Sequence, residues 1–209
     1  MAPQPQGDID SENGVWYHTR CMKKIVVDID NTLWDFAPVF FDALSRHDSE
    51  IPIDALRRGE TRLKGQVSRE RIYEMLRAIH MRQDDFEPYP EARRFLVSLK
   101  DAGFHIIIAS HRDEETRDAT ARWLRKWQFP YDELHLSSDK SVLFPGSWAV
   151  VDDSIWTLDK AAEAGIIRTG LLNAWNADRG HPLFPSLMEV LQYLKEQCRC
   201  GGGTQEEEL

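Results

Sequence analysis

The strongest constraint on the fold is a series of short, almost wholly apolar runs separated by helix-like segments. The runs "KKIVVDI" (23–29), "FHIIIAS" (104–110) and "SWAVVDDS" (147–154) are rich in hydrophobic, β-favouring residues. Strands that are apolar on both faces are typical of parallel sheets, which helices cover on either side. Two further runs, "ELHLSS" (133–138) and "GIIRTGLL" (165–172), predict two more strands.

The segments between the predicted strands have the spacing of amphipathic helices. In one of them Phe95, Leu96 and Leu99 share a face, and Gly103 provides a helix stop. Another carries acids in its first turn and bases in its last, which matches the helix dipole. The predicted helices cover residues 91–103, 113–129, 157–165 and 187–197. The fold class is therefore predicted to be α/β, with a Rossmann-like parallel sheet flanked by helices.

Residues 36–87 interrupt this alternation directly after the first strand. Their pattern is mostly helical, as in "SRERIYEMLRAIHMRQ" (68–83), and their position predicts a small helical cap inserted into the core. Between residues 57 and 77, bases outnumber acids in a chain whose net charge is -9. They form either a solvated helical face or a surface that attracts an anionic substrate. The bases are Arg57, Arg58, Arg62, Lys64, Arg69, Arg71 and Arg77, and the acids are Glu60, Glu70 and Glu74.

Four segments make up the predicted domain organisation. Residues 1–20 form a flexible arm without the basic and apolar regions of a signal peptide. The core consists of residues 21–35 and 88–198, and residues 36–87 form the helical cap. Residues 199–209, with three glycines followed by three glutamates, form a flexible acidic tail.

The composition argues against several classes of protein. A net charge of -9 is unfavourable for binding bulk nucleic acid or a membrane surface. No apolar run approaches the roughly 20 residues that a membrane helix needs. The three cysteines lie near the chain ends and form no disulfide framework, so a reducing cytoplasm is the expected location. The sequence leaves the oligomeric state open.

Polar side chains follow each of the first four predicted strands, at the edge where parallel strands bind ligands. In chain order they are Asp28 and Asp30, Ser110, Lys140, and Asp152 with Asp153. Each alone is an ordinary turn residue. Four carboxylates, one hydroxyl and one amine at a single edge of the sheet, however, predict a functional site.

These residue types suit phosphoryl transfer. Mg²⁺ prefers oxygen ligands, and Asp28 and Asp152 can supply two carboxylates whose repulsion the ion would offset. A carboxylate can also attack phosphorus to give an aspartyl-phosphate. A second carboxylate two residues on, Asp30, can protonate the leaving oxygen and then deprotonate water. Ser110 and Lys140 can bind phosphate oxygens and stabilise charge in the transition state.

The sequence resembles the haloacid dehalogenase (HAD) superfamily. The family's four motifs match, in order, "DIDNT" (28–32), "IIIAS" (106–110), the lysine of "SSDKS" (137–141) and "VVDDS" (150–154). The resemblance implies that Asp28 is the nucleophile and that Asp30 is the general acid/base and lends its backbone carbonyl to Mg²⁺. It also implies that Ser110 and Lys140 hold the phosphoryl group.

The same resemblance assigns the remaining motif residues. It makes Asp152 a ligand of Mg²⁺ and Asp153 a ligand through water or a support for the site, while Thr32 steadies the loop after the first strand. Asp30 favours phosphatases over dehalogenating members, which usually lack a second aspartate.

Two branches of the superfamily compete. The segments 88–110 and 131–141 are similar to the 5'-nucleotidase type C group, which includes the 5'(3')-deoxyribonucleotidases. "DNTLWDF" (30–36) is similar to the magnesium-dependent phosphatase-1 group, whose insert is shorter. The expected function is a Mg²⁺-dependent phosphomonoester hydrolase acting on a small phosphorylated substrate such as a nucleoside monophosphate. The alternatives are a sugar or protein phosphatase, or a non-catalytic binding protein with this fold.

Three further features lie near the predicted site. Trp34 and Phe36 either stack on a base or sugar of the substrate or form a packing hinge between cap and core. His111 follows Ser110, and by the resemblance its backbone N–H, rather than its imidazole, is offered to phosphate. The polar segment 170–181 follows the last predicted strand and is expected at the rim of the site.

Overall fold

The computed structural model describes residues 23–47, 50–58, 67–177 and 179–200. Within them lies a six-stranded sheet in the order β3-β2-β1-β4-β5-β6, and every neighbouring pair is parallel. The strands are β1 (Lys24–Val27), β2 (His105–Ser110), β3 (Glu133–Leu136), β4 (Ser147–Val151), β5 (Ile167–Leu171) and β6 (Leu183–Phe184). The predicted α/β fold with a parallel sheet is confirmed, and each predicted strand is present.

Seven α-helices and three short 3-10 helices accompany the sheet in the described part of the chain. The α-helices are α1 (Phe36–His47), α2 (Ile53–Arg57), α3 (Arg69–Met81), α4 (Ala92–Asp101), α5 (Arg117–Lys126), α6 (Ile155–Glu163) and α7 (Leu187–Cys200). The 3-10 helices are η1 (Gln83–Asp85), η2 (Glu114–Thr116) and η3 (Lys140–Leu143). Gly103 ends α4 in the left-handed conformation, with φ of +83°, as its sequence position predicted.

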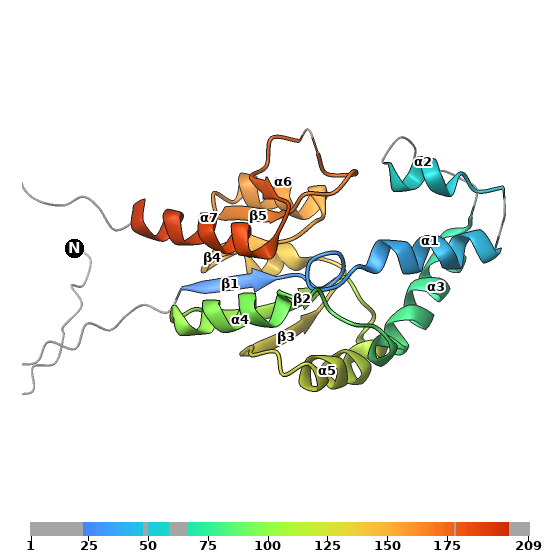
Figure 1. The fold of residues 1–209 in the computed structure, drawn as a ribbon, viewed down its shortest axis with the longest axis horizontal. Coiled ribbons are helices and arrows are strands. Elements are labelled where there is room, and N and C mark those ends of the chain that lie inside the picture. Colours follow the sequence, from blue (N-terminus) through green and yellow to red (C-terminus); the bar gives the residue numbers. More distant parts are fainter. Residues whose placement is uncertain (1–22, 48–49, 59–66, 178, 201–209) are drawn as a thin grey trace, which may run out of the picture.

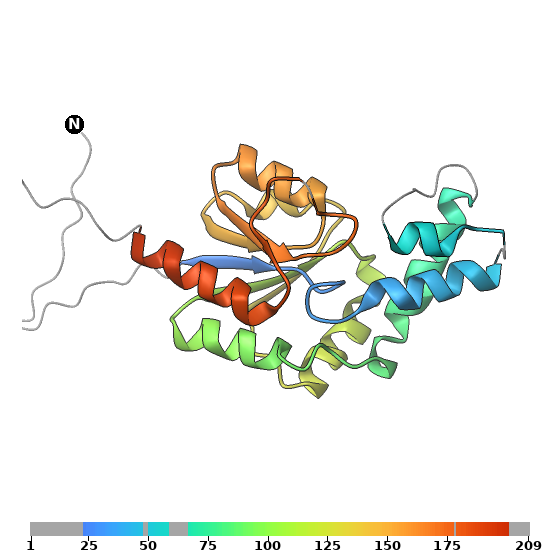
Figure 2. The same ribbon diagram turned by 45° about the horizontal axis from the view of Figure 1, so that its top comes forward.

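The apolar strands are buried because helices cover both faces of the sheet. Ile25 and Val27 belong to a large core cluster with residues of α4 and α7. Val26, which lies between them on the opposite face, packs in a smaller cluster with Ala161 of α6. This alternation explains why β1 is apolar at each position from Ile25 to Val27. Figure 2 shows α4 and α7 on one side of the sheet and α6 on the other.

Helices α1–α3, which we call the cap helices, lie beyond the carboxyl ends of the strands (Figure 1). They have a small core of their own, formed by Leu44, Ile51, Leu56 and Met75. Helix α3 also packs against α5 and η2 of the core. The insert therefore covers the sheet edge at which the sequence places its polar residues.

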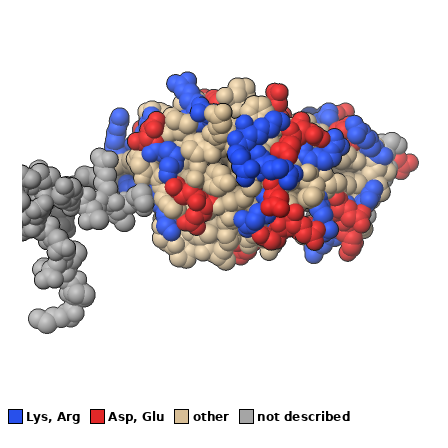
Figure 3. Space-filling model, turned by 90° about the horizontal axis from the view of Figure 1, so that it is seen from below, with Lys and Arg blue, Asp and Glu red and all other residues tan. Residues whose placement is uncertain are grey.

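The described bases of the cap helices are largely paired with acids nearby. Arg71 lies 2.8 Å from Glu74, and Arg77 lies 3.1 Å from Asp113 and 3.3 Å from Glu115. Acidic and basic groups are interleaved over the face that Figure 3 shows. These pairs favour the solvated-face interpretation of the basic stretch. Arg62 and Lys64 lie outside the described residues.

The structure differs from the sequence-based expectation at three places. Strand β6 has only two residues, too few to be recognised from a sequence pattern. The helix predicted over 113–129 is divided into η2 and α5. Helix α7 continues to Cys200, two residues into the predicted tail, while the rest of the tail and the predicted arm at 1–20 lie outside the described residues. No helix among the described residues is long and apolar enough to cross a membrane.

Candidate active site

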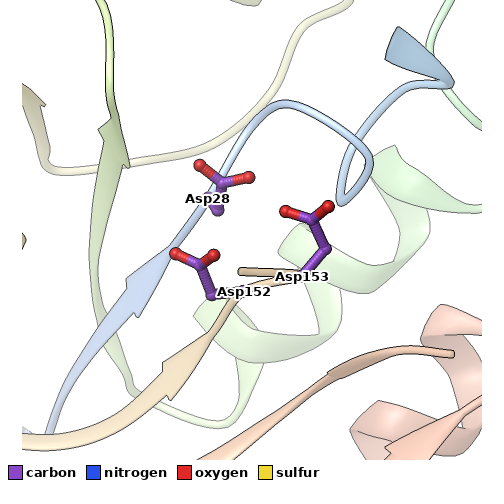
Figure 4. A group of neighbouring side chains, drawn as sticks. All are labelled: Asp28, Asp152 and Asp153. Atoms are coloured by element: carbon purple, nitrogen blue, oxygen red, sulfur yellow. The ribbon is translucent and has the colours of Figure 1, made fainter. Parts of the chain in front are cut away.

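Three carboxylates meet where β1 and β4 end. Asp28 follows β1, and Asp152 and Asp153 follow the neighbouring strand β4, so the parallel pairing brings them together. One ligand oxygen from each lies within 4.8 Å of the others, and all three residues are buried. Figure 4 shows the three side chains gathered at these two strand ends. We call Asp28, Asp152 and Asp153 the acidic cluster.

Lys140 supplies the positive charge that faces this cluster. Its ammonium group, at the start of η3, donates hydrogen bonds to Asp28 Oδ1 and, at 2.7 Å, to Asp152 Oδ2. Only 1% of Lys140 is exposed, yet Asp152 and Asp28 raise its pKa against the effect of burial. One ammonium group thus balances one of three buried carboxylates, and the cluster keeps an excess of negative charge.

The pKa values of two aspartates reflect this excess. Burial raises the pKa of Asp28 well above its ordinary value, even though Lys140 lowers it. Burial and the neighbouring Asp152 raise the pKa of Asp153 to about 7. Holding these groups ionised together is unfavourable unless a further cation is present.

Asp153 is held by donors from two other segments. Asn31 Nδ2 and Trp175 Nε1 each donate to Asp153 Oδ2 at 3.0 Å. Asn176 Nδ2 donates to the backbone oxygen of Asp153 at 3.1 Å. Trp175 and Asn176 belong to the segment 170–181, which the sequence placed at the rim, so this segment contacts the acidic cluster directly.

Asn31 connects the loop after β1 to the acidic cluster and to α1. It adopts a left-handed backbone conformation with φ of +56°, which asparagine tolerates better than most residues. Its Oδ1 accepts a 2.8 Å hydrogen bond from the N–H of Ala37 in α1, while its amide group holds Asp153. Asn31 thereby ties the loop after β1 both to the acidic cluster and to α1.

The backbone of β5 packs directly against the backbone of Asp152. A Cβ atom at Gly170 would lie 1.9 Å from the carbonyl oxygen of Asp152. The N–H of Asp152 donates to the carbonyl of Thr169 at 3.0 Å, which keeps the two strands at this spacing. A residue larger than glycine at position 170 would therefore displace the backbone that carries Asp152.

The acidic cluster fits a divalent cation. Its donors are carboxylate oxygens, which Mg²⁺ prefers, and their charge exceeds that of Lys140. Asp28 Oδ2 is buried and has no hydrogen-bond partner among the described residues, whereas Oδ1 is held by Lys140. An unpaired buried carboxylate oxygen is costly unless it binds a cation or serves in chemistry.

Asp30 has a different environment, although it is only two residues from Asp28. Arg112 donates to both of its oxygens, from Nη2 to Oδ1 at 2.6 Å and from Nε to Oδ2 at 3.2 Å. Trp34 Nε1 donates to Oδ1 at 2.8 Å, and Ser110 Oγ donates to Oδ2 at 3.3 Å. Although burial acts in the opposite sense, Arg112 and His80 bring the pKa of Asp30 well below its ordinary value.

Arg112 is itself fixed by the core. Its side chain is fully buried, and Nη1 donates to Thr120 Oγ1 of α5 at 3.0 Å. His80 of the cap helix α3 approaches Asp30 from the other side, with Nε2 at 3.3 Å from Oδ2. This is an ion-pair distance, and His80 Nε2 makes no hydrogen bond within the described residues. We call Arg112, Trp34, Ser110 and His80 the Asp30 clamp.

The remaining predicted residues have distinct positions. Trp34 is buried, with its ring stacked on Phe86 at a centroid distance of 4.9 Å, and Phe36 packs against Phe40 in the same core. Their ring faces are covered by protein, which is the packing arrangement that the sequence left open as one of two alternatives.

Thr32 lies in the loop after β1, and His111 lies in the loop after β2. Thr32 is buried, and its Oγ1 has no hydrogen-bond partner within the described part of the chain. His111 is exposed and packs against Trp156, with ring centroids 5.7 Å apart. Desolvation by the surrounding protein lowers the pKa of His111, and Lys140 lowers it further.

Sequence reasoning missed the partners of the two aspartate groups. Arg112 lies two positions after Ser110, but an arginine followed by acids indicates a local ion pair rather than a contact with Asp30. His80 lies in an insert helix and carries no motif. Asn31 was visible inside "DIDNT" only as a turn residue.

Comparisons with known proteins agree with this architecture. No protein-family model and no curated protein sequence matches the chain. Solved structures do match: a predicted phosphatase from Clostridium acetobutylicum has 16% identity and a TM-score of 0.62, and covers 84% of this chain and 99% of its own. A haloacid dehalogenase-like hydrolase from Streptococcus pneumoniae has 16% identity and a TM-score of 0.60, with 83% and 99% coverage.

A third match is a putative β-phosphoglucomutase from Thermotoga maritima, with 18% identity and a TM-score of 0.58. It covers 84% of this chain and 99% of its own length. At such identities the likeness concerns the fold. The chain therefore has the Rossmann-like fold of the HAD hydrolases, with the cap helices following its first strand.

Proposed function

We propose that this protein is a Mg²⁺-dependent phosphomonoester hydrolase that works through an aspartyl-phosphate on Asp28. The observation that carries the proposal is the buried acidic cluster. In it Lys140 holds one oxygen of Asp28, and the other, Oδ2, has no hydrogen-bond partner among the residues that the structure describes. The proposed substrate is a small phosphorylated metabolite such as a nucleoside monophosphate, as the resemblance of segments 88–110 and 131–141 suggests.

The first half-reaction transfers the phosphoryl group to the enzyme. Asp28 Oδ2 attacks phosphorus, and the bond between phosphorus and the leaving oxygen breaks. Asp30 gives a proton to that oxygen, so the alcohol departs neutral. Lys140 and Ser110 hold phosphoryl oxygens and stabilise the charge that spreads over them in the transition state.

The second half-reaction releases phosphate. Asp30, now a carboxylate, removes a proton from a water molecule that attacks the phosphorus of the aspartyl-phosphate. The bond between phosphorus and Asp28 breaks, and the Asp28 carboxylate is regenerated. The Asp30 clamp suits this step, because Arg112 keeps Asp30 ionised. In the first half-reaction the Arg112 contact has to loosen so that Asp30 can carry a proton.

Residues of the acidic cluster would hold the Mg²⁺ ion. Asp28 and Asp152 would bind it directly, Asp153 would bind through water or support the site, and the backbone carbonyl of Asp30 would add a ligand. The ion supplies positive charge that lowers repulsion between the phosphoryl group and the carboxylates.

Hydrolysis of para-nitrophenyl phosphate tests the proposal. The wild-type protein with Mg²⁺ should release para-nitrophenol, and EDTA should abolish the release. Asp28→Asn, which matches the wild type in size, should lower turnover by about 10⁴-fold or more, as loss of a nucleophile does elsewhere. A wild-type rate no higher than that of Asp28→Asn would instead favour a non-catalytic binding protein.

A panel of phosphorylated metabolites with Mg²⁺ tests the substrate. Nucleoside 5'- and 3'-monophosphates are expected to give the highest kcat/KM values. A preference for sugar phosphates over every nucleotide would contradict the nucleotide assignment and leave the phosphatase assignment in place.

A further inference from the structure

A cavity of about 330 Å³ lies between cap helix α3 and the loops of the core. It is lined by Tyr73, His111, Arg112, Asp113, Ser138 and Trp156. Tyr73 comes from the cap, and the other residues come from the loops after β2 and β3 and from the start of α6. The cavity is thus built by segments that the fold brings together at the edge where the catalytic residues lie.

The cavity lies on the side of Asp30. Arg112 lines it and also donates to Asp30 at 2.6 Å, so a single side chain separates the cavity from the proposed acid. A general acid stands next to the leaving oxygen, because it must reach that atom with its proton. The body of the leaving alcohol therefore extends toward the side on which Asp30 and this cavity lie.

The walls of the cavity carry aromatic rings that are exposed to solvent. Tyr73 is 53% exposed and Trp156 is 46% exposed, and both are among the five large hydrophobic side chains exposed in the described residues. Leaving rings of this size in water forgoes the free energy of burial. Two such rings facing one cavity are a favourable surface for another flat, apolar ring.

The Trp156 ring is also held in place. Lys160 Nζ lies 3.8 Å from its centroid, and the His111 ring lies 5.7 Å away. An aromatic wall that is already fixed loses little conformational freedom when a ligand packs on it, which favours binding. Because His111 directly follows Ser110, the same loop links this wall to the phosphoryl site.

We propose that this cavity is a leaving-group subsite that selects phosphomonoesters whose alcohol carries a planar aromatic or heteroaromatic ring. The ring packs between Tyr73 of the cap and Trp156 of the core while the phosphoryl group lies at Asp28. A cavity of about 330 Å³ is at the small end of ligand sites and suits one ring system. This inference rests on the proposed phosphatase function and adds to it the two side chains, Tyr73 and Trp156, that would select the ring of the alcohol.

Two matched esters, benzyl phosphate and cyclohexylmethyl phosphate, test the inference. Both have an O–CH₂ leaving group of similar size, and only the first has an aromatic ring. The wild-type kcat/KM for benzyl phosphate should exceed that for cyclohexylmethyl phosphate by about 5- to 10-fold, the range expected for one or two aromatic contacts.

Variants of Tyr73 and Trp156 show whether these side chains cause the preference for the aromatic ester. Trp156→Leu and Tyr73→Leu should each lower the ratio of the two kcat/KM values toward one, and Tyr73→Phe should keep it. Met81→Ala is the matched control, since Met81 is an exposed residue of the same cap helix that does not line the cavity. Its ratio should equal that of the wild type. Thermal melting of each variant shows whether it is folded.

Each contrary result has a defined meaning. Equal kcat/KM values for the two esters in the wild type would overturn the subsite, and so would a ratio unchanged in both Trp156→Leu and Tyr73→Leu. If para-nitrophenyl phosphate and both esters are hydrolysed no faster than by Asp28→Asn, the proposed function itself fails and the subsite fails with it. Hydrolysis of all three esters without a ring preference removes the subsite alone.

Discussion

The acidic cluster and the Asp30 clamp lie side by side but differ in how their buried negative charge is compensated. In the cluster, Lys140 is the one cation among three buried carboxylates. In the clamp, the single carboxylate of Asp30 accepts hydrogen bonds from two nitrogens of the buried Arg112 and from two further donors. Burial raises the pKa of Asp28, whereas Arg112 and His80 outweigh burial and lower that of Asp30.

The difference shows which part of the site needs positive charge that the protein itself does not supply. The clamp is electrically complete, because Arg112 balances Asp30 and its hydrogen bonds satisfy both oxygens. The acidic cluster is incomplete, since within the described part of the chain its charge is unbalanced and Asp28 Oδ2 has no hydrogen-bond partner. We therefore expect a cation and a phosphoryl group to act on the cluster, and proton transfer to depend on the clamp.

The largest effect that separates the two regions is expected from Asp30→Asn. Loss of general acid/base catalysis should lower kcat by roughly 10²- to 10⁴-fold. The loss should be greater for alkyl esters than for para-nitrophenyl phosphate, because a good leaving group needs little protonation. Mg²⁺ should still raise the melting temperature of this variant, since the acidic cluster is intact. An unchanged kcat with alkyl esters would remove Asp30 from the reaction.

A smaller effect is expected when the clamp loses its cation. Arg112→Met should lower kcat by about 10- to 100-fold, because Asp30 loses both its position and the charge that keeps it ionised. Arg112→Lys keeps the charge but loses the bidentate contact with Asp30, so its rate should lie between those of Arg112→Met and the wild type. The measurement is kcat against pH for both variants. Identical rates and pH profiles in wild type and Arg112→Met would show that the contact is structural only.

The smallest effect concerns stability in EDTA. The pKa of Asp153 in the folded protein is about 7, above its unfolded value, so the folded state binds a proton that the unfolded state releases. Its contribution to stability is complete below about pH 4 and is lost as the pH rises toward 7. The pKa of Asp30 is lowered, so its contribution is already complete above pH 4 and stays constant.

The melting temperature in EDTA should therefore fall by about 5 °C between pH 5 and pH 8. Asp153→Asn should reduce this dependence and leave the part that comes from Asp28, whose pKa is also raised. Mg²⁺ should reverse most of the fall by neutralising the cluster. Scanning fluorimetry across this pH range is sufficient for the measurement. A melting temperature that rises with pH, in the wild type but not in Asp153→Asn, would contradict the charge imbalance assigned to the cluster.

The sequence was sufficient to predict the sheet and the cluster for the same reason. Runs such as Ile106–Ile108 can be buried on both sides only inside a covered parallel sheet, and the sheet then fixes where strand ends meet. Asp28, Lys140 and Asp152 follow such ends, so their convergence needed no knowledge of side-chain conformations.

The clamp could not be predicted in this way. Arg112 reaches Asp30 across 82 positions of sequence, and the contact depends on a rotamer that Thr120 fixes from α5. His80 approaches only because α3 packs on the core, which no pattern within the insert indicates. The covered rings of Trp34 and Phe36 likewise follow from the packing of the insert, so the sequence alone left their role open.

Gly170 has a consequence for anyone who wishes to redesign this pocket. The backbone of the fifth strand touches the peptide that bears Asp152 so closely that there is room for a hydrogen atom and nothing more. The exposed cavity walls, Tyr73 and Trp156, can be varied for new substrates, since their side chains face solvent. The backbone next to Asp152 cannot be varied in this way. Its distance from β5 depends on Gly170, a residue that contributes no functional group of its own.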